Sequence, residues 1–108
     1  MPATLPDGFL PALRRRLEAH YGDRLVRAVL FGSYARGEAT EESDVDVLVV
    51  LGGEVDAWEE GKPLSDISVD LMFEFGPALS IVVVDEALYE RNWSFIQNVR
   101  EDALPLPA

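Results

Sequence analysis

The chain of 108 residues contains no cysteine and a single histidine, His20. The absence of cysteine excludes disulfides, zinc–thiolate sites, iron–sulfur clusters and a cysteine nucleophile. No apolar run approaches the ~18 residues of a membrane span, and the first residues have neither the basic nor the apolar region of a secretory signal. We therefore expect one domain over residues 1–108, located in the cytoplasm and without a membrane partner.

Basic residues are also scarce, because nine Lys and Arg against twenty Asp and Glu give a formal net charge of −11. The imbalance lies downstream, since residues 1–36 carry a balance of +3 and residues 37–108 a balance of −14. A field of this sign repels a polyphosphate backbone. General binding of DNA or RNA is therefore not expected unless a cation intervenes.

The apolar pattern predicts an α/β domain, with a mixed sheet of about three to four strands and helices packed on it. A three- and four-residue repeat predicts a helix over 9–21, and runs of β-forming residues predict strands over 24–31, 45–51 and 78–84. Further helices are expected over 54–75, 86–90 and 95–101. Pro63 is expected to break or kink the long helix near its start, because proline lacks the backbone N–H and collides with the preceding turn.

The sequence also gives expectations for several large apolar residues and for the histidine. Met72, Phe73 and Phe75 are expected in the core, with one of the three facing a partner. Trp58 and Trp93 are anchors either of the core or of an interface, and the sequence does not separate these alternatives. His20 is expected to be structural, at the end of the first helix.

Two acidic residues in the segment 32–46 suggest a metal site. Asp44 and Asp46 are two positions apart, so on a strand their side chains leave the same face. Asp46 interrupts an apolar run, where an ionised carboxylate is unfavourable unless a positive group lies beside it. No basic side chain is near in sequence, and Mg²⁺ characteristically binds one or two carboxylates together with water and substrate phosphate. We predict that Asp44 and Asp46 are metal ligands and catalytic residues. If the two acids are considered without the rest of the segment, the alternative is that they are turn residues at the start of a strand.

A turn at Gly32 and Ser33 precedes these acids. Gly32 allows a positive φ or a close approach to a ligand, and Ser33 opens a short helix whose free N–H groups and hydroxyl suit an anion. Arg36 stands where a capping box would have Glu or Gln, so those donors stay available for phosphate. Arg36 either adds a positive group to the same ligand or pairs with Glu38 or Glu42 at the surface.

A metal held by two carboxylates opposite a phosphate-binding turn is suited to displacement at phosphorus. The spacing Gly32-Ser33, ten residues, then Asp44-Val45-Asp46 is similar to the signature of the polymerase-β-like nucleotidyltransferase superfamily. The longer forms Gly-Ser-x-Ala-Arg-Gly and Ser-Asp-x-Asp resemble its minimal nucleotidyltransferase branch. This resemblance implies a small polymerase-β-like domain that binds ATP or another NTP and Mg²⁺, and that transfers a nucleoside monophosphate with loss of pyrophosphate.

The resemblance also implies a partner protein. Members of this branch resemble the antitoxin halves of toxin–antitoxin pairs, in which some adenylylate a HEPN-domain RNase toxin, so a HEPN-domain protein is the expected partner. A second copy of the chain, in a homo-oligomer, is a further expected partner. The acceptor is expected to arrive on another chain, and a small-molecule acceptor such as an aminoglycoside is the less favoured alternative.

One residue type of the family pattern is missing. Active members usually carry a third carboxylate on the strand beside the Asp-x-Asp strand, and its nearest equivalent here is Ser80. Asp85 lies at the far end of that strand, where capping of the next helix explains it equally well. Two hypotheses follow: a Mg²⁺-dependent nucleotidyltransferase that modifies a hydroxyl of a partner protein, or a catalytically weak or inactive antitoxin or nucleotide-binding module.

Overall fold

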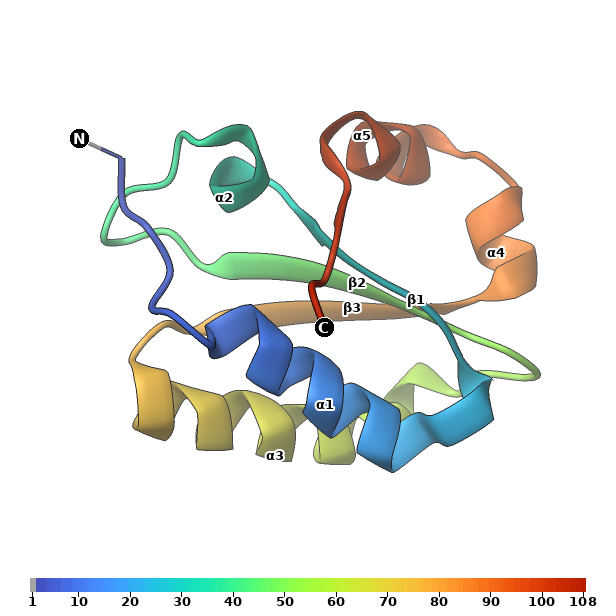
Figure 1. Cartoon of the computed structure of the whole chain (residues 1–108). Helices are drawn as coiled ribbons and strands as arrows, with labels where there is room; N and C mark the ends of the chain where they lie inside the picture. The colour runs from blue at the N-terminus through green and yellow to red at the C-terminus, as the bar shows by residue number, and fades with distance from the viewer. Residues whose placement is uncertain (1) are drawn as a thin grey trace.

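A four-stranded mixed sheet forms the centre of the structure, which is a computed structural model describing residues 2–108 (Figure 1). Its strand order is β3-β2-β1-β4, with the strands β1 (Leu25–Phe31), β2 (Val45–Leu51), β3 (Leu79–Asp85) and β4 (Leu104–Pro105). β1 is antiparallel to both β2 and β4, and β2 is parallel to β3. The mixed sheet predicted from the sequence is therefore confirmed.

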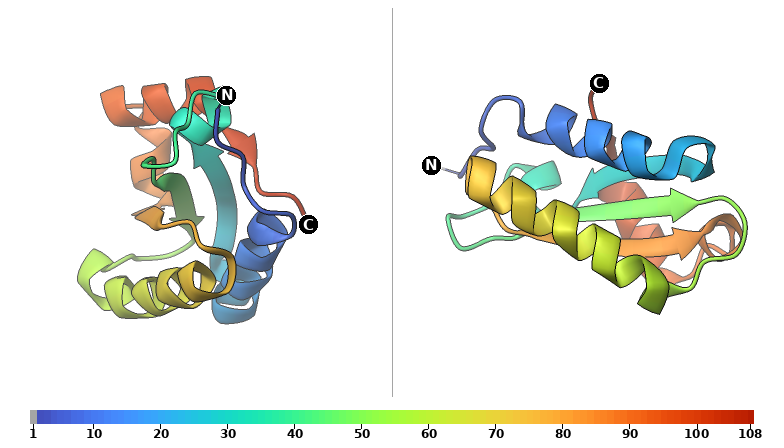
Figure 2. Two further views of the ribbon diagram at one scale, coloured as in Figure 1. Left: turned by 90° about the vertical axis from the view of Figure 1, so that its left-hand side faces the viewer. Right: turned by 90° about the horizontal axis from the view of Figure 1, so that it is seen from below.

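Helices cover both faces of this sheet (Figures 1 and 2). The helices α1 (Phe9–Tyr21) and α3 (Ala57–Phe75) pack on one face, and the shorter helices α4 (Glu86–Glu90) and α5 (Ser94–Asp102) pack on the other. A single turn of helix, α2 (Ser33–Arg36), follows β1 at one end of the sheet, and a 3₁₀ turn (Gly22–Arg24) joins α1 to β1. Within residues 2–108, no helix has both the length and the apolar character that a membrane crossing needs.

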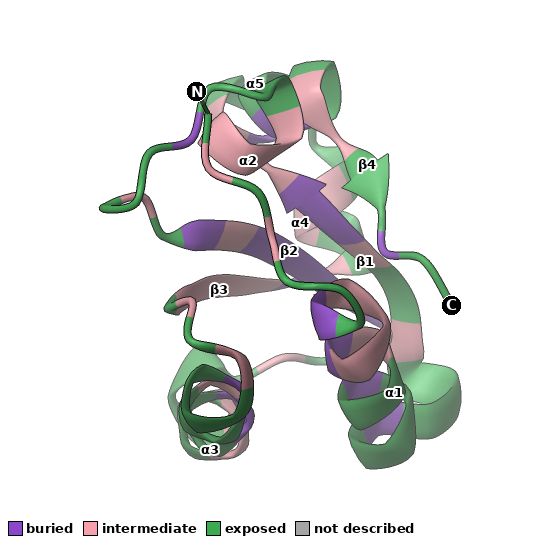
Figure 3. Ribbon diagram, turned by 60° about the vertical axis from the view of Figure 1, so that its left-hand side comes forward, coloured by how far each residue is buried: buried purple, intermediate pink, exposed green. Residues whose placement is uncertain are grey.

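Strand β2 separates two apolar cores. Alternate residues of a strand leave opposite faces, and β2 is apolar on both. Its side chains toward α1 and α3 are Val45, Val47, Val49 and Leu51, and those toward α4 and α5 are Leu48 and Val50; all six are 0% exposed (Figure 3). Asp46 shares the face of Leu48, so its carboxylate lies on the α5 side of the sheet.

Of the two expectations for Pro63, a break or a kink, the break is wrong, because Pro63 lies inside α3 and the helix continues to its end at Phe75. The helix begins at Ala57 because the Asp56 carboxylate accepts a hydrogen bond from the backbone N–H of Trp58 at 2.9 Å. Packing of its inner face onto the sheet outweighs the one backbone hydrogen bond that proline removes. That inner face consists of Leu64, Ile67 and Leu71.

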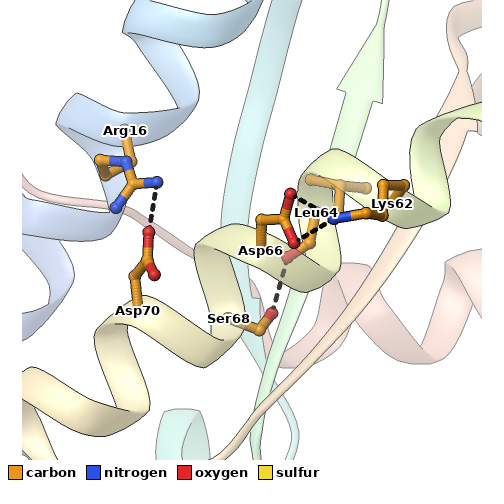
Figure 4. Close-up of polar contacts among 6 residues, drawn as sticks. All are labelled: Arg16, Lys62, Leu64, Asp66, Ser68 and Asp70. Atoms are coloured by element: carbon orange, nitrogen blue, oxygen red, sulfur yellow. Dashed lines mark hydrogen bonds and ion pairs between the residues drawn. The ribbon is translucent and has the colours of Figure 1, made fainter.

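Polar contacts tie α3 to α1 and to itself (Figure 4). Arg16 of α1 donates to Asp70 of α3 at 2.9 Å, and within α3 Lys62 donates to Asp66 at 2.7 Å. The Tyr21 hydroxyl donates to a Glu60 carboxylate at 3.0 Å. Burial, with a smaller contribution from Glu60, raises the pKa of Tyr21. The contacts of Arg16 and Tyr21 tie α3 to α1, whereas Trp58 and Phe73 on its outer side remain 90% and 84% exposed.

The outer face of α3 corrects another expectation. Phe75 packs edge-on against Phe9 in the core, with ring centroids 5.6 Å apart, as expected. Phe73 is 84% exposed, however, and Met72 is 40% exposed, whereas the sequence predicts only one of the three residues outside the core, so the expectation is wrong for one of these two. Positions 72 and 73 lie on the side of the helix away from the buried residues, because a helix turns 100° per residue. Trp58 is also no core anchor, since it is 90% exposed.

Candidate functional site

The turn after β1 meets the start of β2 at one end of the sheet. Phe31 pairs with Asp46 across the two strands, which brings the next residue, Gly32, against the Asp46 carboxyl group. Gly32 has φ 77° and ψ −156°. A Cβ built on Gly32 would collide with the Asp46 carboxylate and lie 3.2 Å from its Cγ. Both the backbone conformation and the close approach therefore require glycine here.

Gly32 also precedes the short helix that the sequence predicts. Ser33 is the first residue of α2, and no side chain caps the N-terminus of this helix. The helix closes with a hydrogen bond from the backbone N–H of Arg36 to the Gly32 carbonyl at 3.1 Å, and Gly37 ends it at φ 73°. The donors of the first turn are thus not occupied by a capping side chain, as the missing capping box predicts.

The electrostatic environment of Asp46 is unfavourable for a bare carboxylate. Burial raises the pKa of Asp46, and the negative charge of Asp44 raises it further, while Arg36 opposes both. Asp44 lies just before β2 and is exposed, whereas Asp46 is half-buried. Two carboxylates that repel each other in this way form a donor set that a divalent cation would neutralise.

Arg36 is engaged in ion pairs. Its Nε donates to Glu38 at 3.0 Å and its Nη1 donates to Asp102 of α5 at 2.8 Å. The hydrogen bond to Glu38, and next the one to Asp102, raise the pKa of Arg36. The sequence suggests Glu38 and Glu42 as surface partners of Arg36. Among the ion pairs of the described chain, Arg36 pairs with Glu38 and not with Glu42. Asp102 is 66 residues from Arg36, and nothing in the local sequence pattern indicates this pairing.

The strand beside Asp46 carries a hydroxyl where the family pattern has a third carboxylate. Ser80 pairs with Asp46 in the parallel register of β2 and β3, as the sequence predicts. Asp85 pairs with Leu51 at the other end of these strands, about 17 Å away for a strand rise of ~3.3 Å per residue. There it accepts the backbone N–H of Leu88 at 2.7 Å and caps α4, so it does not complete the site.

The site therefore offers the Asp46 carboxylate against a glycine turn and the open start of a helix, with the Asp44 carboxylate just before the same strand. Within residues 2–108, no cluster of three His, Cys, Asp or Glu residues is arranged to hold a metal ion. Mg²⁺ ordinarily binds one or two carboxylates of a protein and takes its remaining oxygen ligands from water and phosphate. The residues present fit this ion and an anionic phosphate ligand.

Comparison with known proteins shows which family and which proteins this chain is similar to. The family model described as "Nucleotidyltransferase domain" matches residues 10–105. The chain is 40% identical over 88 residues to MJ0604 of Methanocaldococcus jannaschii, which is provisionally named a protein adenylyltransferase. This match covers 80% of this chain and 82% of that protein. It is 46% identical over 43 residues to the protein adenylyltransferase MntA of Thermococcus cleftensis, covering 40% of this chain and 41% of that one.

A solved structure shares the fold. The crystal structure of a toxin–antitoxin with AMP-PNP superimposes with a TM-score of 0.64 at 21% sequence identity. The match covers 92% of this chain and 73% of that one. At this identity the likeness concerns the arrangement of helices and strands.

Proposed function

This chain belongs to the nucleotidyltransferase domain family, in its minimal branch, and on that premise we propose that it transfers a nucleoside monophosphate from ATP to a hydroxyl group of a partner protein. The observation that carries the proposal is the position of the Asp46 carboxylate against the Gly32 turn. Asp46 would hold the metal and the Gly32 turn would hold the phosphates, and their closeness would let the metal neutralise the phosphate charge. The enzyme class, nucleotidyltransferase, follows from the family.

We propose that Asp44 and Asp46 hold Mg²⁺ when nucleotide is bound. The ion would neutralise the phosphates and the charge that develops on the leaving oxygen. The raised pKa of Asp46 supports this assignment, because burial and Asp44 make its charge unfavourable until a cation is present. Gly32 and Ser33 would hold the phosphates through backbone N–H groups and the Ser33 hydroxyl.

The reaction proposed is a single displacement. The acceptor hydroxyl oxygen forms a bond to the α-phosphorus as the bond from that phosphorus to the bridging oxygen breaks, pyrophosphate leaves, and the hydroxyl proton passes to solvent. Arg36 lies close enough to lower the pKa of Asp46 and would face the same phosphates. Its pairing with Glu38 and Asp102 holds the guanidinium at this end of the sheet.

A partner protein is the acceptor we favour, and a HEPN-domain toxin is the proposed partner. The uncovered outer face of α3 supports a protein partner, since Trp58, Val69 and Phe73 lie on it at helical spacing and are 90%, 43% and 84% exposed. The helix carries five acidic residues and one basic residue. A partner with an apolar centre and a basic rim would complement this face better than a second copy of the same acidic chain.

The proposal is tested by incubating the protein with ATP labelled at the α-phosphate, Mg²⁺ and the product of the adjoining reading frame. We expect label on the partner protein, and we expect Asp46→Asn to reduce its rate at least a hundredfold, since a metal site contributes several kcal/mol to such reactions (about 1.4 kcal/mol per tenfold). Asp70→Asn is the matched control, because Asp70 is an exposed carboxylate on the opposite face of the sheet. Labelling that persists in Asp46→Asn would contradict the proposal.

The second candidate function is a nucleotide-binding antitoxin without transfer activity, and the hydroxyl of Ser80 opposite Asp46 favours it. The same experiment separates the two functions. A complex that silences the partner while no label appears, in the presence of bound ATP, would identify the binding module.

A further inference from the structure

Three aromatic side chains form a row that starts at the candidate site. The ring of Phe31, on β1, meets that of Phe95, on α5, edge-on at 5.8 Å between centroids. The Phe95 ring in turn meets the Trp93 indole at 5.4 Å with 41° between the ring planes. The row thus leads from the residue directly before Gly32 to the start of α5.

This row lies on the face of the sheet that carries the Asp46 carboxylate. Phe31 and Asp46 are direct cross-strand partners, so both side chains leave the same face. Phe31 and Phe95 pack in the apolar cluster beneath α4 and α5. A ligand whose phosphates lie at Gly32 and Asp46 would therefore lie on the same face of the sheet as this row, and Trp93 is the one member of the row that is exposed.

The last member of the row is open to solvent and held in place. Trp93 is 43% exposed. The turn before it is fixed by Asn92, which has a φ of 54°, and by Gln97, whose Nε2 donates to the Asn92 carbonyl at 2.9 Å. The backbone N–H of Gln97 also donates to the Trp93 carbonyl at 2.9 Å. An indole supported on one side by Phe95 and positioned by its backbone is organised before any ligand arrives.

We propose that Trp93, supported by Phe95, is the stacking surface for the base of the nucleoside triphosphate, an inference that rests on the nucleotide site proposed above. Stacking on an aromatic ring accepts every base, because each base has a π-face. The chain should therefore accept several nucleoside triphosphates and bind purines more tightly than pyrimidines.

The chain's two tryptophans allow a direct test. The variant Trp58→Phe leaves Trp93 as the only indole, and Trp93→Phe leaves only Trp58, which lies on α3 across the sheet. Each is titrated with ATP and Mg²⁺, and with inorganic tripolyphosphate and Mg²⁺, while calorimetry measures binding independently. We expect ATP to quench the fluorescence of Trp93 and not that of Trp58, and tripolyphosphate to bind without quenching either.

Substitution gives the second measurement. Trp93→Ala should weaken ATP binding roughly tenfold, within the range known for loss of one stacked base, and leave tripolyphosphate binding unchanged. Trp93→Phe should restore most of the affinity. ATP binding by calorimetry without quenching of Trp93, or equal quenching of Trp93 by tripolyphosphate, would each overturn the stacking proposal alone. No binding of ATP or tripolyphosphate to the unaltered chain would overturn the nucleotide site as well.

Discussion

At Gly32, two separate constraints favour glycine over every other residue. Its φ of 77° and ψ of −156° lie in a region that only glycine occupies without strain. The space where a Cβ would lie is filled by the Asp46 carboxylate. The sequence pattern identifies this glycine as a turn next to a ligand, and the structure adds that its neighbour is the metal-binding candidate itself.

The first prediction concerns Gly32→Ala. The backbone strain should lower the free energy of unfolding by about 1–3 kcal/mol, and the clash should displace Asp46 and abolish Mg²⁺-dependent nucleotide binding. Gly53→Ala is the control, because Gly53 also has a φ of 77° and no atom lies within 4 Å of its would-be Cβ. Urea unfolding and calorimetry with ATP measure the two effects. Equal destabilisation of both variants, with binding retained in both, would refute the close approach.

The second prediction concerns the charge of Asp46. Its pKa is raised in the folded chain, so the folded state binds a proton more readily than the unfolded state. The contribution of Asp46 to the stability of the metal-free protein should therefore increase as the pH falls through that raised pKa, and decrease as the pH rises through it. Asp46→Asn carries no charge, so it should be more stable than the unaltered chain at neutral pH.

Thermal unfolding over a series of pH values measures this difference. The gain from Asp46→Asn should shrink on acidification, because the parent carboxyl group is then also neutral. Added Mg²⁺ and ATP should stabilise the unaltered chain and not the variant, since only a ligand that binds the folded state raises its stability. A variant less stable than the parent at neutral pH would show that Asp46 has a structural partner.

At the level of the elements, turn residues made the predictions accurate. Three glycines mark the ends of elements in the sequence, and the structure has each end within about a residue of the glycine. Gly22 follows α1, Gly32 follows β1 and Gly76 follows α3. The errors came from α3, where tertiary packing decides the outcome. Pro63 is tolerated because the inner face of the helix is buried, and Phe73 is exposed because it lies opposite that face. The local sequence pattern does not predict the tolerance of Pro63 or the exposure of Phe73, because both depend on which side of the helix packs on the sheet.

The third prediction separates capping from catalysis at Asp85. Asp85→Ala removes the acceptor for the Leu88 N–H and should cost about 1 kcal/mol of stability, whereas Asp85→Asn keeps a capping side chain and should cost little. Neither variant should change the rate of nucleotide transfer, because Asp85 lies at the far end of β3. Urea unfolding and the labelling assay measure the two effects. A large loss of transfer in Asp85→Asn, without loss of stability, would make Asp85 the missing third carboxylate.

For the whole molecule, the sequence indicates a mixed sheet without giving the order of its strands. The apolar run at 45–51 indicates that this strand lies inside the sheet, and β2 does lie between β1 and β3. The pairing of the last segment, β4, with β1 depends on a contact between residues more than 70 positions apart, such as Val29 with Pro105. The ion pair of Arg36 with Asp102 is of the same kind. Contacts between residues so far apart in the sequence depend on the complete fold. The motif therefore predicts which residues form the candidate site, but it does not predict the contacts around them, such as the ion pair of Arg36 with Asp102.

The last prediction concerns the outer face of α3. Phe73→Arg should change the free energy of unfolding by less than about 0.5 kcal/mol, because an exposed side chain with no partners contributes little to stability. It should nevertheless weaken the complex with the product of the adjoining reading frame, since a charge would enter the apolar centre of the proposed contact and meet the basic rim of the partner. Val26→Arg is the matched control, because Val26 is 42% exposed and lies on β1, away from α3. Analytical ultracentrifugation of each variant, alone and with the partner, measures self-association and complex formation together. If Phe73→Arg dissociates a dimer of this chain and leaves the partner complex intact, the face binds a second copy, and the acidic surface around it does not select a basic partner.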